Sequence, residues 1–216
     1  MSRIDIRNLS KTIKGSLILD NINVSFMSGS IYGLRGKNGC GKTMLMRCIC
    51  GLVIPTTGSI IIDEQQLHKD IMIPKSIGAL IENPVFLPQY TGYKNLKLLA
   101  SLTGNIKKEE ITKALERVGL DPQDKRVYKK YSLGMKQKLG IANAIMGEPE
   151  IIVLDEPINA RDEESVKLIK KELLRLSERG KLIIIACHDK EELEYLCDII
   201  YEMKCGCIID QEEMSV

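Results

Sequence analysis

The most informative segment of this 216-residue chain reads Gly36-Lys37-Asn38-Gly39-Cys40-Gly41-Lys42-Thr43. Its spacing, G-x-x-x-x-G-K-[ST], is that of a phosphate-binding loop, because the glycines let successive backbone N–H groups point inward at an anion. Lys42 is expected to reach the β- and γ-phosphates, and the Thr43 hydroxyl to ligate Mg²⁺. A strand before the loop and a helix from Met44 after it complete the pattern, which a chance glycine-rich turn would lack. The segment therefore predicts binding of a nucleoside triphosphate.

A second group of residues follows a run of aliphatic side chains at 151–154. Asp155 and Glu156 come directly after this run, which has the pattern of a buried strand, so both carboxylates are expected at its C-terminal tip. Asp155 is placed to hold Mg²⁺, and Glu156 to polarise the water that attacks the γ-phosphate. The alternative is a core strand that ends in a solvated acidic turn. The phosphate-binding loop upstream favours the catalytic interpretation.

The segment between these two motifs reads Tyr131-Ser132-Leu133-Gly134-Met135-Lys136-Gln137-Lys138-Leu139. Ser132 can cap a helix and offer its hydroxyl to an anion, while Gly134 lets the backbone approach closely. Together with the two motifs above, the segment resembles the ATP-binding subunits of ABC transporters, in which a Leu-Ser-Gly-Gly-Gln signature opens a helix. Leu133 and Met135 depart from that signature. The resemblance implies that Ser132 and Gly134 face the γ-phosphate of ATP held by a second subunit, so that two chains complete each site.

Two further positions take their roles from this resemblance alone. Asp162 matches the acid at the dimer seam, in the loop after the acidic strand, although Arg161 stands where the family usually has Leu. His188, at the tip of the aliphatic strand 181–187, matches the histidine that contacts the γ-phosphate. Without the family, a lone histidine would be interpreted as a surface or packing residue.

Two positions depart from the family in ways that affect the chemistry. Glu82 stands where most relatives carry a Gln that senses Mg²⁺ and the attacking water. A carboxylate can also ligate Mg²⁺, but it adds negative charge beside the phosphates. Ile13 stands where an aromatic ring usually stacks on adenine, so weaker discrimination between bases is expected.

Glu82-Asn83-Pro84 and the segment 131–137 look like one branch of the family, the exporters related to bacitracin and lantibiotic resistance or immunity. This branch implies that the chain powers a separate membrane permease, which exports a peptide antibiotic or a similar compound. The implied location is cytoplasmic, peripheral on the inner face of the membrane. The implied partners are the permease and a second ATPase subunit, either a second copy or a close paralogue, in a head-to-tail dimer.

A soluble ATP-driven clamp acting on nucleic acid or ribosomes is the alternative function. Such relatives carry two cassettes in one chain or a coiled-coil insertion before the signature, whereas here no heptad run separates Thr43 from Ser132. A non-hydrolysing nucleotide-binding regulator is a third candidate. The presence of both Glu156 and His188 argues against it.

Composition limits the possible binding partners of the chain and indicates the redox environment in which it works. The chain has 31 basic and 29 acidic side chains, so no nucleic-acid partner is expected. No apolar run reaches the ~18 residues of a membrane-spanning helix and no signal peptide is apparent, so membrane attachment is expected through a partner. The seven cysteines, an odd number in mostly apolar contexts, indicate reduced thiols. Cys40, two residues from Lys42 and beside a helix N-terminus, is expected to be the most reactive of them.

The pattern of elements predicts an α/β fold. We expect a P-loop NTPase core with a parallel sheet flanked by helices, an N-terminal antiparallel β flank, and an inserted helical subdomain that carries the signature. Strand patterns dominate the first 63 residues, helical patterns follow, and strands and helices alternate from residue 151. The whole chain, 1–216, is expected to form one ATPase domain. Its core would comprise 1–82 and 147–216, with the helical subdomain at about 83–146.

Overall fold

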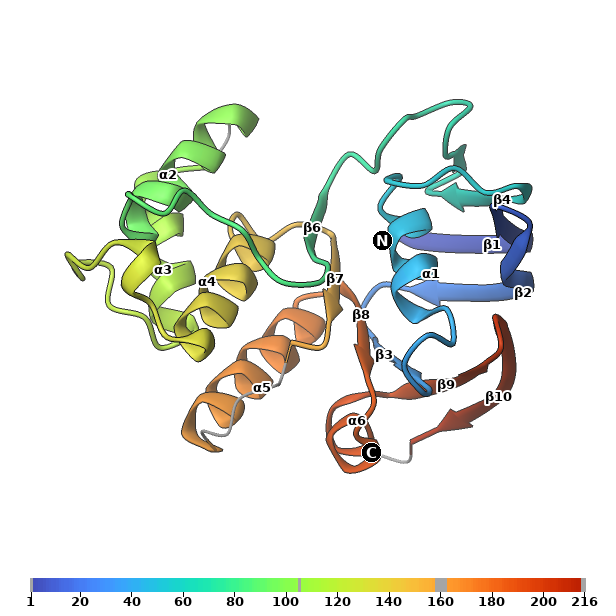
Figure 1. Ribbon diagram of the computed structural model, residues 1–216. Coiled ribbons are helices and arrows are strands. Elements are labelled where there is room, and N and C mark those ends of the chain that lie inside the picture. The colour runs from blue at the N-terminus through green and yellow to red at the C-terminus, as the bar shows by residue number, and fades with distance from the viewer. Residues whose placement is uncertain (1, 105, 158–162, 215–216) are drawn as a thin grey trace.

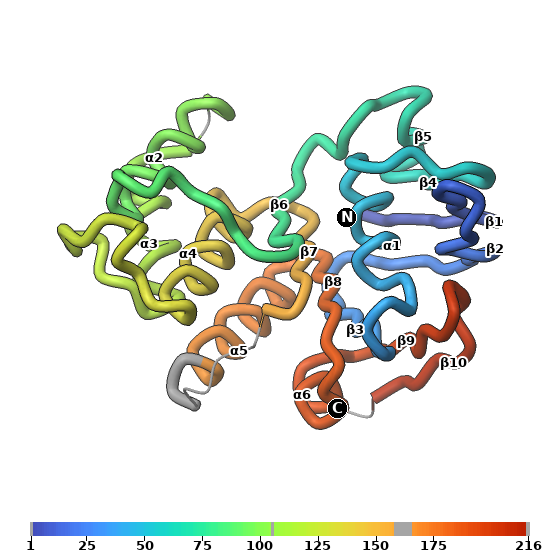
Figure 2. The backbone as a smooth tube through the Cα atoms, in the orientation of Figure 1, coloured from blue at the N-terminus to red at the C-terminus, as the bar shows by residue number. Residues whose placement is uncertain are grey.

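The computed structural model describes residues 2–104, 106–157 and 163–214, and in them the chain forms two sheets and a group of helices (Figures 1 and 2). The elements run in the order β1 Arg3–Ile13, β2 Ser16–Met27, β3 Ile31–Arg35, α1 Lys42–Ile49, β4 Thr57–Ile62, β5 Gln65–Gln66, β6 Ile77–Leu80, α2 Gly92–Thr103, α3 Lys108–Arg117, the short 3₁₀ helix η1 Tyr128–Lys130, α4 Leu133–Ile145, β7 Ile151–Asp155, α5 Glu163–Glu178, β8 Leu182–Cys187, α6 Lys190–Leu196, β9 Ile199–Lys204 and β10 Cys207–Glu213.

The larger sheet has the strand order β10-β9-β3-β8-β7-β6. All its neighbours pair in parallel except β10, which pairs antiparallel with β9 at one edge. Every residue of β7 and β8 is buried, because both faces of a parallel sheet are covered. Strands buried on both faces are typically unbroken runs of aliphatic residues, as these two largely are. Alternate side chains along β7 enter two cores: Ile152 packs with the helices, and Val153 with α1 and the smaller sheet.

The smaller sheet is antiparallel, with the order β2-β1-β4-β5. Along β2, buried side chains such as Leu19, Ile22 and Phe26 alternate with exposed ones, which is the pattern of a sheet with one face in the core. Helix α1 contacts both sheets, and Leu45 shares one apolar cluster with Phe26 and with residues of β7 and β8. The helix that follows the phosphate-binding loop is therefore held on both sides.

Helices α2, α3 and α4 follow β6 in the chain and lie together at one end of the molecule (Figure 1). Thr91 caps α2 by accepting a hydrogen bond from the Lys94 amide, and Ser132 caps α4 by accepting one from Met135 at 3.2 Å. These bonds satisfy backbone donors that a helix start leaves open. The division of the chain into a core and a helical subdomain at 83–146 remains a prediction.

The α/β fold class is confirmed, and the differences from the sequence prediction are local. β1 extends as far as Ile13 because it pairs with β2 up to the partners Ile13 and Ser16. β6 and β10 are additional strands. β6 is a short, mixed segment whose strand state depends on pairing with β7, and β10 is half-exposed at a sheet edge. In the described part of the chain, no helix has the length and apolarity needed to cross a bilayer.

Candidate active site

The phosphate-binding loop connects β3 to α1 and is shaped by its glycines. Gly41 lies immediately before α1 with φ +113°, and a side chain there would come within 2.9 Å of Leu19. A side chain at Gly36 would meet the backbone carbonyl of Met203. Only glycine avoids both the strained backbone and these clashes. The sequence pattern therefore reports a real steric requirement at these two positions.

Lys42 is buried, with 6% of its surface exposed, and its ammonium group turns back over the loop. Its Nζ donates to the carbonyl of Gly36 at 2.6 Å and lies 3.4 Å from the carbonyl of Lys37. A buried cation needs such partners, and a phosphate oxygen in the loop would be a stronger acceptor than a carbonyl. Lys42 is thus positioned to exchange a backbone acceptor for the nucleotide.

Thr43 and Asp155 are joined across the site. The Thr43 hydroxyl donates to Asp155 Oδ2 at 2.6 Å, and Asp155 at the end of β7 is 6% exposed. Burial raises the pKa of Asp155, and the hydrogen bond from Thr43 opposes that rise. A hydroxyl and a carboxylate in contact are the hard oxygen ligands that Mg²⁺ prefers, so the donor set fits this ion.

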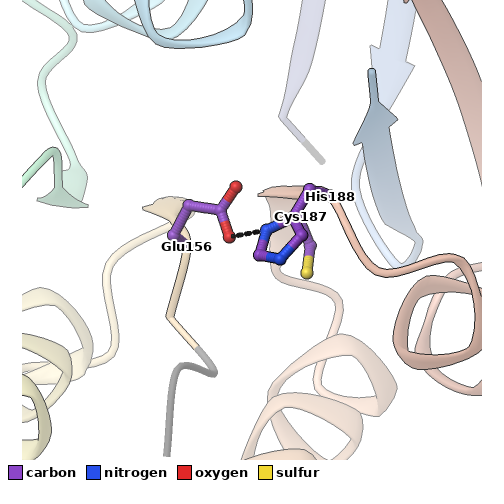
Figure 3. A group of neighbouring side chains, drawn as sticks. All are labelled: Glu156, Cys187 and His188. Carbon is purple, nitrogen blue, oxygen red and sulfur yellow. Dashed lines mark hydrogen bonds and ion pairs between the residues drawn. The ribbon is translucent and has the colours of Figure 1, made fainter. Parts of the chain in front are cut away.

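Glu156 and His188 meet at the neighbouring tips of β7 and β8 (Figure 3). His188 Nδ1 lies 2.9 Å from Glu156 Oε2. Because an ionised carboxylate only accepts hydrogen bonds, this contact requires the proton on Nδ1. Glu156 has a left-handed backbone, φ +49°, and its amide donates to the carbonyl of Ala186 at 2.9 Å. Strain held in place by surrounding contacts is a feature that accumulates at functional sites.

One cavity of about 520 Å³ joins the loop to these carboxylates. The residues that line it are Ile18, Asn38, Gly39, Gly41, Lys42, Thr43, Met44, Arg47, Glu82, Asn83, Gln137, Asp155 and Glu156. Asp155 and Glu156 at the end of β7 meet the loop here, together with Glu82 from a segment far away in the sequence. The cavity is concave, polar in part and large enough for a ligand, as a nucleotide site requires.

Four lining residues were not selected as site residues from the sequence: Ile18, Arg47, Gln137 and Asn83, the neighbour of Glu82. Ile18 comes from β2, and only the packing of the two sheets brings it to the cavity. Arg47 lies one turn after Met44 on α1, so the helical period would have placed both on one face. Gln137 on α4 reaches across to donate from Nε2 to the Glu156 carbonyl at 2.9 Å.

Other predicted site residues lie outside this lining. Ile13 is at the end of β1, and it is Ile18 that lines the cavity. Ser132 and Gly134 are at the start of α4 and are not among the lining residues, an arrangement compatible with action on another subunit. Asp162 lies outside the described residues. The roles given to these four positions remain predictions.

Cys40 lies inside the loop but is 8% exposed, and its carbonyl accepts the Gly206 amide at 2.9 Å. Its sulfur packs close to Gly36, as the clash of a side chain built there shows. Burial removes the access that high reactivity requires, so the structure does not support Cys40 as the most reactive thiol. Cys205, in the turn between β9 and β10, is the exposed cysteine of the seven.

Glu82 follows β6 at the rim of the cavity. Its carboxylate lies 2.7 Å from the guanidinium of Arg47, and its backbone is left-handed, with φ +60°. The extra negative charge expected from the sequence is therefore present, and it has a cationic partner on α1.

A glycine-rich loop, a Thr–Asp pair and Glu156 line one cavity, and Glu156 is paired with His188 just outside the lining. These features define a P-loop nucleoside triphosphatase. The family model described as "ABC transporter" matches residues 19–159. The chain belongs to this family: it is the ATP-binding subunit of an ABC transporter, and it is an ATPase.

Its relatives include named transport proteins. An uncharacterized ABC transporter ATP-binding protein of Bacillus subtilis, YybJ, is 47% identical over 98% of this chain and 97% of its own length. The bacitracin transport ATP-binding protein BcrA of Enterococcus faecalis is 40% identical over 98% of this chain and 70% of its own. The lantibiotic transport ATP-binding protein SrtF of Streptococcus pyogenes is 35% identical over 97% of this chain and 90% of its own length. These names confirm the resemblance to the bacitracin and lantibiotic branch.

A solved structure shows the same fold. The ATP-binding cassette MJ0796, a dimer bound to ADP and phosphate in a post-hydrolysis state, matches with a TM-score of 0.90 over 99% of both chains at 22% identity.

Proposed function

We propose that this chain hydrolyses MgATP to power a separate membrane permease that exports a peptide antibiotic or a similar compound. The observation that carries the hydrolytic part is the meeting of the Thr43–Asp155 and Glu156–His188 pairs at adjacent strand tips facing the phosphate-binding loop. The cargo is inferred from BcrA and SrtF, whose names assign them to bacitracin and lantibiotic transport. The permease would hold the chain at the inner face of the membrane.

The reaction is attack of water on the γ-phosphorus. The new P–O bond forms as the bond to the β–γ bridging oxygen breaks, and ADP leaves with that electron pair. Lys42 and the loop amides hold the phosphates. Glu156 orients the water and accepts its proton, while His188 fixes the Glu156 carboxylate through the 2.9 Å bond and reaches the γ-phosphate. Thr43, Asp155 and Glu82 would hold Mg²⁺, which supplies charge neutralisation at the phosphate oxygens.

A second subunit would complete each site. Ser132 caps α4 with its hydroxyl, and an added side chain at Gly134 would meet no atom of the described residues within 4 Å, so this backbone is open to a ligand. Leu133 between them is 76% exposed. An open helix start of this kind suits a phosphate presented by another chain. The same dimer would bring Asp162 to the seam, and MJ0796 is a protein of this fold that was solved as a dimer.

The function is tested by searching the neighbouring genes for one that encodes a hydrophobic multi-span protein and co-expressing that protein with this chain. Co-purification from membranes, together with resistance to bacitracin or a lantibiotic that Glu156→Gln abolishes, is the expected result. An active ATPase that neither co-purifies with that protein nor changes resistance would refute transport and favour the soluble clamp.

A further inference from the structure

The charges around the nucleotide cavity are unbalanced before any ligand binds. Among the described residues that line it, Glu82, Asp155 and Glu156 are acidic, whereas Lys42 and Arg47 are basic. ATP brings further negative charge to this site. With a neutral residue in place of Glu82, the lining charges would cancel, so Glu82 is the source of the surplus.

Arg47 is the group that faces this surplus charge. Its guanidinium lies 2.7 Å from the Glu82 carboxylate, and it is a third exposed, against 60% for Glu82. Surface ion pairs of this exposure contribute little to folding. We expect this ion pair to affect the binding of a nearby anion more than it affects folding. Loss of the cation at the rim would leave the Glu82 carboxylate without a partner beside the phosphates.

The Glu82 backbone also restricts where this carboxylate points. Glu82 adopts φ +60°, a left-handed conformation that is uncommon for a residue other than glycine and persists when surrounding contacts hold it. Its partner Arg47 lies in the last turn of α1, the helix that begins with Lys42. The ion pair thus connects the phosphate-binding helix to the segment after β6.

We propose that Arg47 is a positioning residue that holds the Glu82 carboxylate at the rim of the nucleotide cavity and offsets the charge that Glu82 adds there. The assignment rests on the proposed role of Glu82 and deepens it. It predicts that replacing Arg47 lowers the affinity for nucleotide because residue 82 is acidic. Arg47 would matter far less beside a neutral residue.

A double-mutant cycle tests this coupling. Equilibrium titration with a fluorescent ATP analogue in EDTA measures the charge effect without Mg²⁺ and without hydrolysis, using the wild type, Arg47→Met, Glu82→Gln and the double variant. Arg47→Met is expected to weaken binding roughly fivefold when Glu82 is present and less than about twofold when Gln occupies position 82. With Mg²⁺ present, Arg47→Met should raise the Mg²⁺ concentration needed for half-maximal nucleotide binding when residue 82 is Glu. It should not raise it when residue 82 is Gln.

Arg3→Met is the matched control, because Arg3 forms an exposed ion pair with Asp5 at 2.9 Å and does not line the cavity. It should leave nucleotide affinity unchanged, and urea unfolding of each variant verifies the fold. Equal weakening by Arg47→Met in both backgrounds, or no weakening in either, would overturn the assignment. The EDTA titration does not involve a permease or the catalytic base, so its failure is distinguishable from failure of the proposed transport function.

Discussion

Replacing Glu148 by Gln is expected to remove the centre of an ion-pair network that joins two helices. Glu148 lies in the loop between α4 and β7, and it accepts hydrogen bonds from Arg117 at 2.8 Å, Arg175 at 2.9 Å and Arg179 at 2.8 Å. Arg117 belongs to α3, while Arg175 and Arg179 approach from the α5 side. The substitution keeps the shape of the side chain and removes the carboxylate shared by all three arginines, while Glu172 still pairs with Arg117 and Arg175.

The magnitude follows from the titration of this carboxylate. Burial alone would raise the pKa of Glu148, but the hydrogen bonds from Arg117, Arg179 and Arg175 outweigh it and hold the pKa at about 2, against an ordinary 4.5. That difference corresponds to about 3 kcal/mol of stability for the charged form. The side chain is 25% exposed, and solvent screening reduces the expected loss to about 2 kcal/mol at pH 7.

The pH dependence of the loss has a definite direction. Because the folded state holds the pKa of Glu148 below its unfolded value, the stabilisation is complete above about pH 4.5 and declines as the pH falls toward 2. The difference in unfolding free energy between wild type and Glu148→Gln should therefore be constant from pH 7 to pH 5. Below about pH 4.5 it should shrink, since the unfolded wild-type chain binds a proton at Glu148 that the folded chain does not bind until the pH approaches 2.

Urea unfolding monitored by circular dichroism at several pH values measures this difference. Glu150→Gln is the control, because Glu150 is two residues away, is 51% exposed and, among the described residues, forms an ion pair only with Lys181, at 2.7 Å. It should cost less than about 0.5 kcal/mol. Equal losses for the two variants, or a loss for Glu148→Gln that does not change with pH below 4.5, would refute the reasoning.

Three further predictions concern the site. Glu156→Gln should retain ATP binding, lower hydrolysis at least ~10²-fold and give an ATP-bound dimer on a sizing column; near-normal turnover would remove Glu156 from its role. Brief maleimide treatment followed by mass spectrometry should find Cys205 modified before the buried Cys40, with ATPase activity retained; early loss of activity with label on Cys40 would contradict this. GTP should compete with ATP within about tenfold, since Ile13 and the cavity-lining Ile18 are both aliphatic and offer no ring to stack on the base; competition assays showing a preference for ATP beyond a hundredfold would mean that another group reads adenine.

Some parts of the fold and site could be read from local sequence. The loop from Gly36 to Thr43 is recognisable because its chemistry depends on backbone freedom and residue order, which are local properties. The unbroken aliphatic runs of β7 and β8 identify strands buried on both faces. The acidic pair after β7 follows from the same run. The fold class, the family and the enzymatic class could be predicted from these stretches together with the segment 131–139.

Only the tertiary structure placed the groups that come from separate elements. The ion pair between Arg47 and Glu82, the hydrogen bond from Gln137 to Glu156, and the arrival of Ile18 at the cavity depend on how α1, α4 and the two sheets pack. The burial of Cys40 could not be predicted for the same reason: its sequence neighbours suggest an open loop, whereas its sulfur packs close to Gly36. Sequence determined the chemistry carried by each short segment, because backbone geometry and side-chain type are local. Packing decided which distant segments are in contact. It therefore also decided the solvent access of Cys40 and the balance of charges around the nucleotide cavity.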